Sequence, residues 1–411
     1  MRAYQRLMHY AKFPTASAAA SPTCPSTEHQ LAFAKELQKE LIELGLSDVT
    51  LDENGYLFAT LPANIPDHPG PVIGFLAHMD VSEDAPAESV QPQLIEKYDG
   101  GDILLNAAEN IVMTVEENPI LQQYIGDDLV VTDGLTLLGA DDKAGIAEIV
   151  TMAETLLQDD SIKHGKIMLG FTPDEEIGRG PDHFDVARFG ADFAYTLDGA
   201  DVEEVGSETF SAMSMNVTVT GVGIHPGEAK NKMINAQRVA LEFDALLPEG
   251  DRPEHTEGRE GFFHLHWMNG EVERAFMHYI LRDYDFSLLE RRAALARDAA
   301  DYLNRKYGAD TVKLEIEESY RNMYEVLLQH PHLLEIANDA IRAEGLTPRH
   351  GALRGGTDGS RLSYMGLPCP NLGTGSHNHH GRMEFASAQA MDCVVRILLR
   401  IAERYGQGIV E

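Results

Sequence analysis

Short, nearly continuous apolar runs recur in the first half of the chain and predict buried strands. The runs are VIGFLA (72–77), KIMLGF (166–171) and FAYTL (193–197). Such runs are typical of strands that are covered on both faces. Between the first two, AGIAEIVTMAETLL carries apolar residues at helical spacing from Ile146 to Leu157. The alternation predicts an α/β domain with a mostly parallel sheet flanked by helices.

An earlier helix is predicted by PSTEHQLAFAKELQKELIELG, in which Ala34, Leu37, Leu41 and Leu44 share one helical face. At many helix N-termini, the side chain of a Ser or Thr accepts a hydrogen bond from the backbone N–H of the third helical residue. The side chain of a Glu or Gln at that third position accepts one from the backbone N–H of the Ser or Thr. We therefore expect a capping box between Thr27 and Gln30.

A different pattern begins near residue 213, where MSMNVTVT alternates apolar and polar residues, as in a half-exposed strand. A helix (INAQRVALEFDALL), two strands (FFHLHWMNG and FMHYILRDYD), a long helix and a strand (TVKLEIEE) follow. This order, βαββαβ, is that of a complete small α+β domain. The α/β pattern then resumes to the C-terminus. We expect one discontinuous α/β domain, 1–207 and 321–411, interrupted by an inserted α+β domain, 208–320.

Composition narrows the classes of partner. The 411 residues include 66 acidic and 33 basic side chains, a formal charge of −33. Nucleic acids and anionic membranes require basic patches, so neither is an expected partner. The charge suits a cation site, but it equally suits solubility. Three scattered cysteines (Cys24, Cys369 and Cys393), no apolar core of signal-peptide length and no run of about 20 apolar residues predict a cytoplasmic protein with free thiols.

Each predicted buried strand is followed by side chains that can bind metals. His78 and Asp80 follow the first run, Glu175 and Glu176 follow the second, and Asp198 follows the third. Sites in open α/β sheets form outside the carboxyl ends of the strands. On an extended segment Glu175 and Glu176 would point in opposite directions, so we expect them to have different tasks.

Two further motifs contribute possible ligands. Asp141 and Asp142 lie in LLGADDKAG, just before a predicted helix, and GSHNHHG contains His377, His379 and His380. Taken singly, these motifs have ordinary interpretations: a lone histidine is usually structural, an Asp-Asp-Lys turn often caps a helix, and a Glu-Glu pair is often a solvated loop. Together, the carboxylates and imidazoles form a ligand set for zinc or a similar divalent ion.

The motifs HMD, LLGADDKAG, TPDEEIG, YTLDGA, HPG and GSHNHHG resemble those of the dinuclear zinc metallopeptidases that include carboxypeptidase G. TLPAN, MHYILRDYD, RGGTDG and MGLPCPNL extend the likeness to the tripeptide aminopeptidases of that family over nearly the whole chain. The resemblance implies a zinc-peptidase catalytic domain with an inserted domain of the lid or dimerisation type. It also implies that the chain removes the N-terminal residue from tripeptides.

The same resemblance implies a ligand for each metal position. Asp141 would bridge two zinc ions, His78 and Asp198 would complete one site, and Glu176 and His380 would complete the other. The two Zn²⁺ ions would carry four positive charges, of which the carboxylates of Asp141, Asp198 and Glu176 would neutralise three. A bridging hydroxide would balance the remaining positive charge. The resemblance further implies a cis peptide bond between Asp141 and Asp142.

Catalytic roles are implied as well. Asp80 would orient the imidazole of His78, and Glu175 would act as general base for the hydroxide that attacks the scissile carbonyl. His225, in GIHPGEAK of the inserted domain, would reach the active site when the lid closes; its ordinary alternative is a turn histidine before a proline.

The resemblance implies that Arg354, and with less support Asn235 and Arg282, hold the substrate backbone or its carboxylate. The planar guanidinium of arginine suits that task. For Arg282 the alternative is an ion pair with Asp283 at a strand end.

Three functions stay open at this stage. The first is a di-zinc tripeptide aminopeptidase, and the second is a related dipeptidase, carboxypeptidase or N-acyl-amino-acid deacylase with the same metals. The third is a non-catalytic metal-binding protein, which the loss of Glu175 or of a ligand would have favoured. The expected partners are small peptides, and a homodimer is an assembly to be tested.

Overall fold

The computed structural model describes residues 1–408, which divide into two compact units. Unit 1 comprises Met1–Ser207, Glu325–Gly351 and the chain from Thr357 onward, and unit 2 comprises Glu208–Tyr324 and Ala352–Gly356. The inserted domain was expected to end at residue 320, whereas this part of unit 2 ends four residues later, at Tyr324. Residues 409–411 of the expected α/β domain lie outside the described residues. Ala352–Gly356 belongs to unit 2 because β16 (Ala352–Leu353) pairs in parallel with β11 (Glu208–Thr209).

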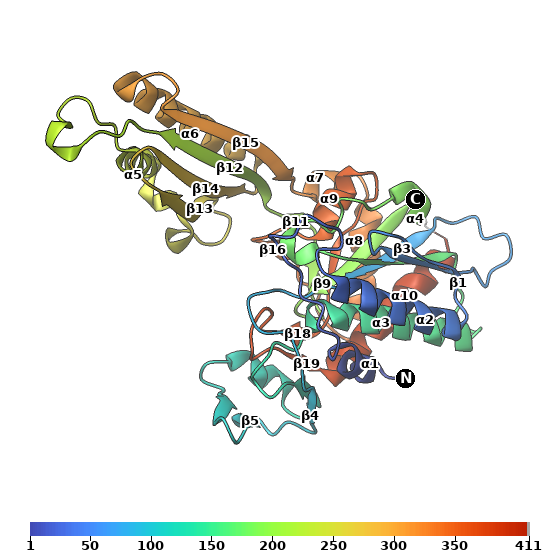
Figure 1. Cartoon of the computed structure of the whole chain (residues 1–411). Coiled ribbons are helices and arrows are strands. Elements are labelled where there is room, and N and C mark those ends of the chain that lie inside the picture. Colours follow the sequence, from blue (N-terminus) through green and yellow to red (C-terminus); the bar gives the residue numbers. More distant parts are fainter. Residues whose placement is uncertain (409–411) are drawn as a thin grey trace. The chain divides into compact units, whose positions relative to one another are not determined.

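Unit 1 is a mixed α/β unit (Figure 1). Its helices are α1 (Ala3–Tyr10), α2 (Glu28–Leu44), α3 (Ala140–Gln158), α4 (Val186–Phe189), α8 (Pro331–Ala343), α9 (Asp358–Tyr364) and α10 (Ala388–Gly406), with α7 (Tyr324–Leu327) at the boundary. The strands of its main sheet are β1 (Ser47–Leu51), β2 (Leu57–Leu61), β3 (Ile73–His78), β8 (Ile167–Thr172), β9 (Phe193–Gly199), β10 (Val205–Gly206) and β17 (Asn371–Gly373).

The main sheet has the strand order β1-β2-β8-β3-β9-β17-β10. The four central strands run parallel, whereas β1, β2 and β10 pair antiparallel with their neighbours. The three apolar runs are the central strands β8, β3 and β9, and the expected α/β class is confirmed. Because these strands are parallel and adjacent, their carboxyl ends meet at one edge of the sheet.

Both faces of this sheet are covered, which explains why its central strands are apolar throughout. On one face, the ring of Phe75 stacks on Tyr195, whose hydroxyl donates to the carbonyl of Leu333 in α8. The next residue of β3, Leu76, points to the opposite face and packs in a cluster with Phe189 of α4 and Leu362 of α9.

A smaller sheet in unit 1 has the order β18-β19-β7-β4. Its strands are β4 (Gln93–Ile95), β7 (Leu129–Val131), β18 (Ser376–His377) and β19 (Phe385–Ser387), with the hairpin β5 (Ile103–Asn106) and β6 (Ile111–Met113) beside them in sequence. The loop between β18 and β19 carries the histidine-rich motif, so this sheet anchors it on both sides.

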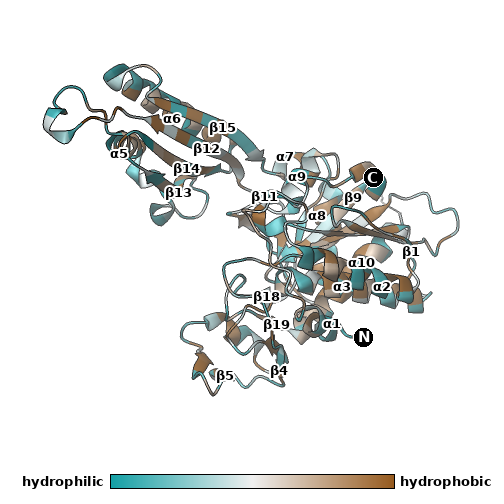
Figure 2. Cartoon of the chain, viewed as in Figure 1, coloured by the Kyte–Doolittle hydropathy of each residue, from teal (hydrophilic) through white to brown (hydrophobic). Residues whose placement is uncertain are grey.

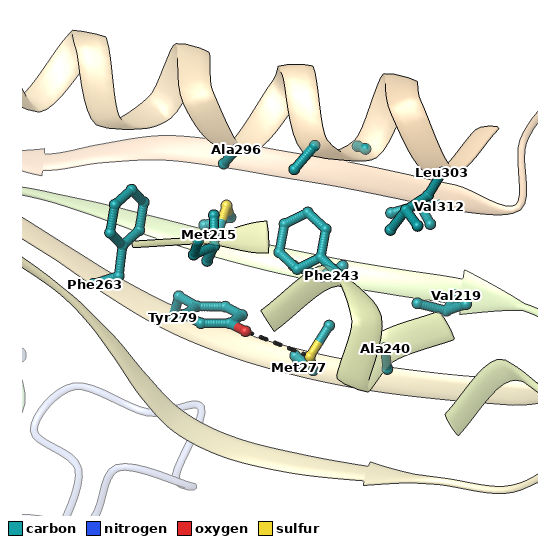
Figure 3. Close-up of a cluster of buried hydrophobic side chains, with 14 of the residues drawn as sticks. Met215, Val219, Ala240, Phe243, Phe263, Met277, Tyr279, Ala296, Leu303 and Val312 are labelled. Carbon is teal, nitrogen blue, oxygen red and sulfur yellow. Dashed lines mark hydrogen bonds between the residues drawn. The ribbon is translucent and has the colours of Figure 1, made fainter. Parts of the chain in front are cut away.

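Unit 2 has the predicted βαββαβ order. Its elements are β12 (Ser211–Thr220), α5 (Ala236–Leu246), β13 (Phe262–Gly270), β14 (Arg274–Asp283), α6 (Phe286–Tyr307) and β15 (Val312–Tyr320). The antiparallel sheet has the order β13-β14-β12-β15. Figure 3 shows Phe243 of α5 and Leu303 of α6 among the buried side chains of this unit, whose core is a cluster of its own.

The helix α2 begins where the sequence predicts, but it lacks the expected capping box. Thr27 makes no side-chain cap hydrogen bond, because its hydroxyl donates to the carbonyl of Ala16. The side-chain amide of Gln30 instead donates to the buried carboxylate of Asp174 at 2.7 Å.

Figure 2 shows hydrophilic and hydrophobic residues alternating along α2 and α6, as expected for helices with one buried face. Among residues 1–408, no helix is long and apolar enough to cross a membrane.

Candidate metal centre

The carboxyl ends of β3, β8 and β9 bring most of the predicted ligands together. His78 is the last residue of β3, Glu175 and Glu176 follow β8, and Asp198 lies next to the last residue of β9. Asp141 enters from the N-terminus of α3. These residues lie in unit 1, and their donor atoms form two groups in which every atom is within 4.8 Å of the others. The groups are His78 with Glu175 and Asp198, and His78 with Asp141 and Glu176.

His78 is buried, and its two ring nitrogens face different partners. The Nδ1 atom lies 3.0 Å from the carbonyl oxygen of Asp80, which can only accept a hydrogen bond. In neutral His78 the Nε2 lone pair therefore faces Asp141 Oδ1 at 2.9 Å and Asp198 Oδ1 at 3.5 Å. Burial opposes protonation, but the hydrogen bonds to these carboxylates raise the pKa of His78 well above its usual value. The arrangement requires a cation, either a proton or a metal ion.

Asp141 presents each of its carboxylate oxygens to a different histidine. Oδ1 faces His78, whereas Oδ2 lies 3.3 Å from His380 Nε2. The same His380 nitrogen lies 2.9 Å from Glu176 Oε2. Although burial favours the neutral carboxyl, His379, His380 and His78 hold the pKa of Asp141 well below its usual range. A carboxylate with imidazoles at both of its oxygens fits a ligand that bridges two cations.

Glu175 and Glu176 form a single 3₁₀ turn and not the extended segment that we expected. The turn follows Asp174, whose backbone is left-handed (φ 58°). The carboxylate of Asp80 holds the turn by accepting from the amide of Glu175 at 2.9 Å and from that of Glu176 at 3.1 Å. The carboxylate oxygen of Asp80 is 3.5 Å from His78 Nδ1, farther than its carbonyl. Asp80 thus joins the strand end to the turn.

The surroundings of the two glutamates differ. Burial, followed by the charge of Asp198, raises the pKa of Glu175 well above its usual value. Burial also raises the pKa of Glu176, to about 7, against the opposing hydrogen bond from His380. The hydrogen bond to Asp141, followed by the one to Glu176, raises the pKa of His380 to about 11. The site concentrates negative charge that a bound cation would neutralise.

The expected cis peptide bond between Asp141 and Asp142 is confirmed. The segment before it is held by Glu384, which the sequence did not single out. This buried carboxylate accepts hydrogen bonds from the amides of Leu138, Gly139 and Asp141 at 2.7–2.9 Å. Glu384 is four residues beyond His380. Its neighbours in sequence, Met383 and Phe385, gave no signal for this role.

The three histidines of GSHNHHG have different positions. His377 lies against Tyr124, with its Nε2 at 2.5 Å from the tyrosine hydroxyl, and His379 Nδ1 lies 3.4 Å from Asp141 Oδ2. His380 is the one that reaches both Asp141 and Glu176, and its Nδ1 is 3.3 Å from Asp84. Asp84 was also missed by sequence reasoning, although it is four residues from Asp80.

A buried carboxylate behind the site was likewise missed. Asp358, the first residue of α9, accepts a hydrogen bond from the hydroxyl of Thr172 at 2.7 Å. It lines a small cavity together with His78, Glu175 and Asp198. Burial raises the pKa of Asp358 to about 7. Asp358 belongs to RGGTDG, whose Arg354 alone had been assigned a role.

The remaining predicted site residues lie in unit 2, where each has local contacts. His225 Nδ1 accepts from the amide of Gly227, and Asn235 caps α5 by accepting from the amide of Arg238. Arg282 donates to the carbonyl of Arg354 at 2.9 Å, whereas its buried Nε–H has no hydrogen-bond partner within residues 1–408. Among the recorded ion pairs, Asp283 is paired with Arg292.

Arg354 is engaged by the loop between α5 and β13. Its guanidinium donates to the carbonyl oxygens of Thr256, Gly258 and Glu260 and packs over the ring of Phe210. These contacts hold the loop in place, which is a structural role that the sequence did not suggest.

Comparison with known proteins gives consistent matches. The family model for peptidase family M20/M25/M40 matches residues 131–404. The chain is 50% identical over 403 residues to a protein named Peptidase T of Caldanaerobacter subterraneus subsp. tengcongensis, covering 98% of both. In fold it is similar to aminopeptidase PepT from Bacillus cereus ATCC 10987 (TM-score 0.76, 22% identity, 98% of both chains). It is likewise similar to a tripeptidase from Staphylococcus aureus subsp. aureus Mu50 (TM-score 0.77, 22% identity, 99% and 98% of the two chains).

Proposed function

The chain belongs to peptidase family M20/M25/M40, and on that premise we propose that it is a di-zinc aminopeptidase that removes the N-terminal residue from tripeptides. The observation that carries the proposal is the position of Asp141, whose two carboxylate oxygens each face a different histidine. The names of the similar proteins, Peptidase T and a tripeptidase, support tripeptides as the substrate class.

The residues around Asp141 fit a pair of metal ions. His78 and Asp198 would complete one site with Asp141, and Glu176 and His380 would complete the other. Imidazole nitrogens mixed with carboxylate oxygens form a donor set that suits zinc. When bound, the metals supply Lewis-acid chemistry that polarises the scissile carbonyl and lowers the pKa of the attacking water.

Glu175 would move the proton in this proposal. It would take a proton from the attacking water and deliver it to the leaving amine. This task requires a carboxylate that lies within reach of the metals but is a ligand of neither. The backbone of Glu175 is held by Asp80, so its side chain starts from a defined position. Asp80 is thereby a positioning residue that links His78 to the general base.

We assign unit 2 the role of a lid whose closure brings His225 to the developing oxyanion. Asn235 and Arg354 would have to exchange their local hydrogen bonds before binding a substrate. Arg282, whose Nε–H has no partner within residues 1–408, is better prepared to bind a carboxylate. A cytoplasmic location and a homodimer remain parts of this proposal.

Hydrolysis of matched peptides tests the proposed function. We expect the zinc-loaded protein to release the first residue of tripeptides with a free α-amine, and to cleave their N-acetylated forms with kcat/KM lower by at least about tenfold. Mass spectrometry of the products identifies which bond breaks.

The alternatives predict different products. Faster cleavage of acetylated peptides would indicate a deacylase, release of the last residue a carboxypeptidase, and preference for dipeptides a dipeptidase. Two bound metals without hydrolysis of any peptide would indicate a non-catalytic metal-binding protein.

A further inference from the structure

Three histidines gather on the face of the unit 2 sheet that α5 and α6 leave uncovered. The helices pack on the face formed by residues such as Met277 and Tyr279 of β14. The alternate residues point the other way. Among these are His264 and His266 of β13 and His278 of the adjacent β14.

A β-bulge interrupts the ladder next to these imidazoles. His264 is opposite Ile280 and Trp267 is opposite His278, with the irregularity between Leu265 and Trp267. The bulge leaves His266 without a paired residue, and bulges of this kind re-aim side chains. The ring centroids of His264 and His266 are 5.8 Å apart, as are those of His266 and His278.

His278 is oriented for a ligand. Its Nδ1 lies 3.0 Å from the amide oxygen of Asn216, directly opposite on β12. Because that oxygen only accepts, Nδ1–H is the donor, and the Nε2 lone pair is free. A second ring nitrogen that donates to an oxygen is the usual arrangement of a metal-binding histidine.

The other two imidazoles have fewer contacts. Within residues 1–408, the side chains of His264 and His266 have no hydrogen-bond partner; His266 is exposed and His264 is half-buried. Burial, followed by the charges of neighbouring histidines, lowers the pKa of both His264 and His278. The lowered pKa favours the neutral imidazole, which is the form that binds metals.

We propose that His264, His266 and His278 form a transition-metal site on unit 2, in addition to the candidate centre of unit 1. Rotation of the side chains of His264 and His266 brings their nitrogens toward His278 Nε2. Three imidazoles with an open fourth position bind Zn²⁺, and they also suit Ni²⁺ and Cu²⁺, whereas Mg²⁺ and Ca²⁺ prefer oxygen ligands.

The single tryptophan of the chain reports directly on this site. Trp267 is stacked on His278, with ring centroids 6.3 Å apart and planes 19° from parallel. We expect Ni²⁺, a paramagnetic quencher, to reduce the emission of the tag-free, metal-stripped full-length protein saturably, and Zn²⁺ to compete. The Asp141→Ala chain, which lacks the bridging residue of unit 1, should show the same quenching, so the result is independent of the proposed peptidase function.

Substitutions decide whether the three histidines carry the effect. His266→Ala should weaken Ni²⁺ binding by at least tenfold, and Asn216→Ala by about 10–100-fold, because it removes the partner that orients His278. His255→Ala, at an exposed histidine of unit 2 that is not one of the three, is the matched control and should leave the titration unchanged. Circular dichroism checks that each variant is folded. Quenching that does not saturate, or that survives in both His266→Ala and the double variant His264→Ala/His278→Ala, would overturn the proposal.

Discussion

At the scale of single residues, Glu175 and Glu176 are adjacent but have different neighbours. The Glu175 donor atom groups with His78 and Asp198, whereas Glu176 forms a hydrogen bond with His380. The two side chains thus have different partners, although they share one turn of 3₁₀ helix and both group with His78. Different neighbours imply different consequences when each carboxylate becomes an amide.

Glu175→Gln should retain both metals while kcat falls by about 10²–10⁴-fold, because the variant keeps the shape of the side chain but cannot accept a proton. Glu176→Gln should reduce the metal content from two ions toward one at limiting zinc, and excess zinc should partly restore turnover. Metal analysis and kinetics on both variants provide the comparison. If Glu175→Gln loses a metal and Glu176→Gln does not, the roles of the two residues are reversed.

Glu148 is a second informative residue, and it lies in α3 away from the metal centre. Its side chain is fully buried, and neither carboxyl oxygen has a hydrogen-bond partner within residues 1–408. Burial raises the pKa of Glu148 well above its usual value. The folded chain thus holds a proton here that the unfolded chain releases at a lower pH.

The free energy of unfolding should therefore contain a contribution from Glu148 that is complete below the unfolded pKa and is lost as the pH rises toward the folded pKa. Glu148→Gln removes this titration, so its stability relative to the original chain should increase between about pH 5 and 8. Urea unfolding at both ends of this range measures the difference. Glu36→Gln, at an exposed site on α2, should show no such trend; an identical trend in both variants would refute the assignment.

At the scale of elements, α5 holds unit 2 together through a few fully buried side chains. Phe243 is 0% exposed and packs against Tyr279, with ring centroids 6.1 Å apart. Because the unit 2 core is a cluster of its own, damage to it should remain local.

Phe243→Ala should destabilise unit 2 by about 3–5 kcal/mol, since it removes apolar contacts and leaves a cavity. Limited proteolysis should then cut within 208–324 first. Leu241→Ala, on the same helix but at a 57% exposed residue, is the control and should be nearly silent. Equal protection of unit 2 in the two variants would show that α5 is not essential to the core.

At the scale of the whole molecule, the proposed peptidase function requires the two units to cooperate. The candidate metal centre lies in unit 1, whereas His225 lies in unit 2 at the start of a short 3₁₀ turn. Within residues 1–408, the hydrogen bonds of His225 are with the amides of Gly227 and Glu228 in its own turn, so His225 can engage a substrate without a large structural cost.

His225→Ala should lower kcat while leaving the zinc content unchanged, because the variant loses an oxyanion donor and no ligand. Steady-state kinetics with metal analysis tests this, and Lys230→Ala in the same segment serves as the control. Unchanged turnover in His225→Ala would show that this residue belongs only to the turn.

The sequence by itself determined the central strands β3, β8 and β9, the order of elements in unit 2 and most of the ligands proposed for the metal centre. These features depend on local patterns: β3, β8 and β9 are apolar throughout because both of their faces are covered. Their carboxyl ends then place His78, Glu176 and Asp198 at one edge without further information. The family motifs identified His380 among three histidines.

Only the tertiary structure decided which distant side chains support those residues. Glu384 holds the amide of Asp141 from 243 positions away, and Asp174 takes the amide of Gln30 that the sequence assigned to a capping box. The same holds for Arg354, which binds a loop nearly 100 residues away. No local pattern encodes such contacts, because a hydrogen bond formed after folding depends on where the chain returns and not on which residues are neighbours in sequence.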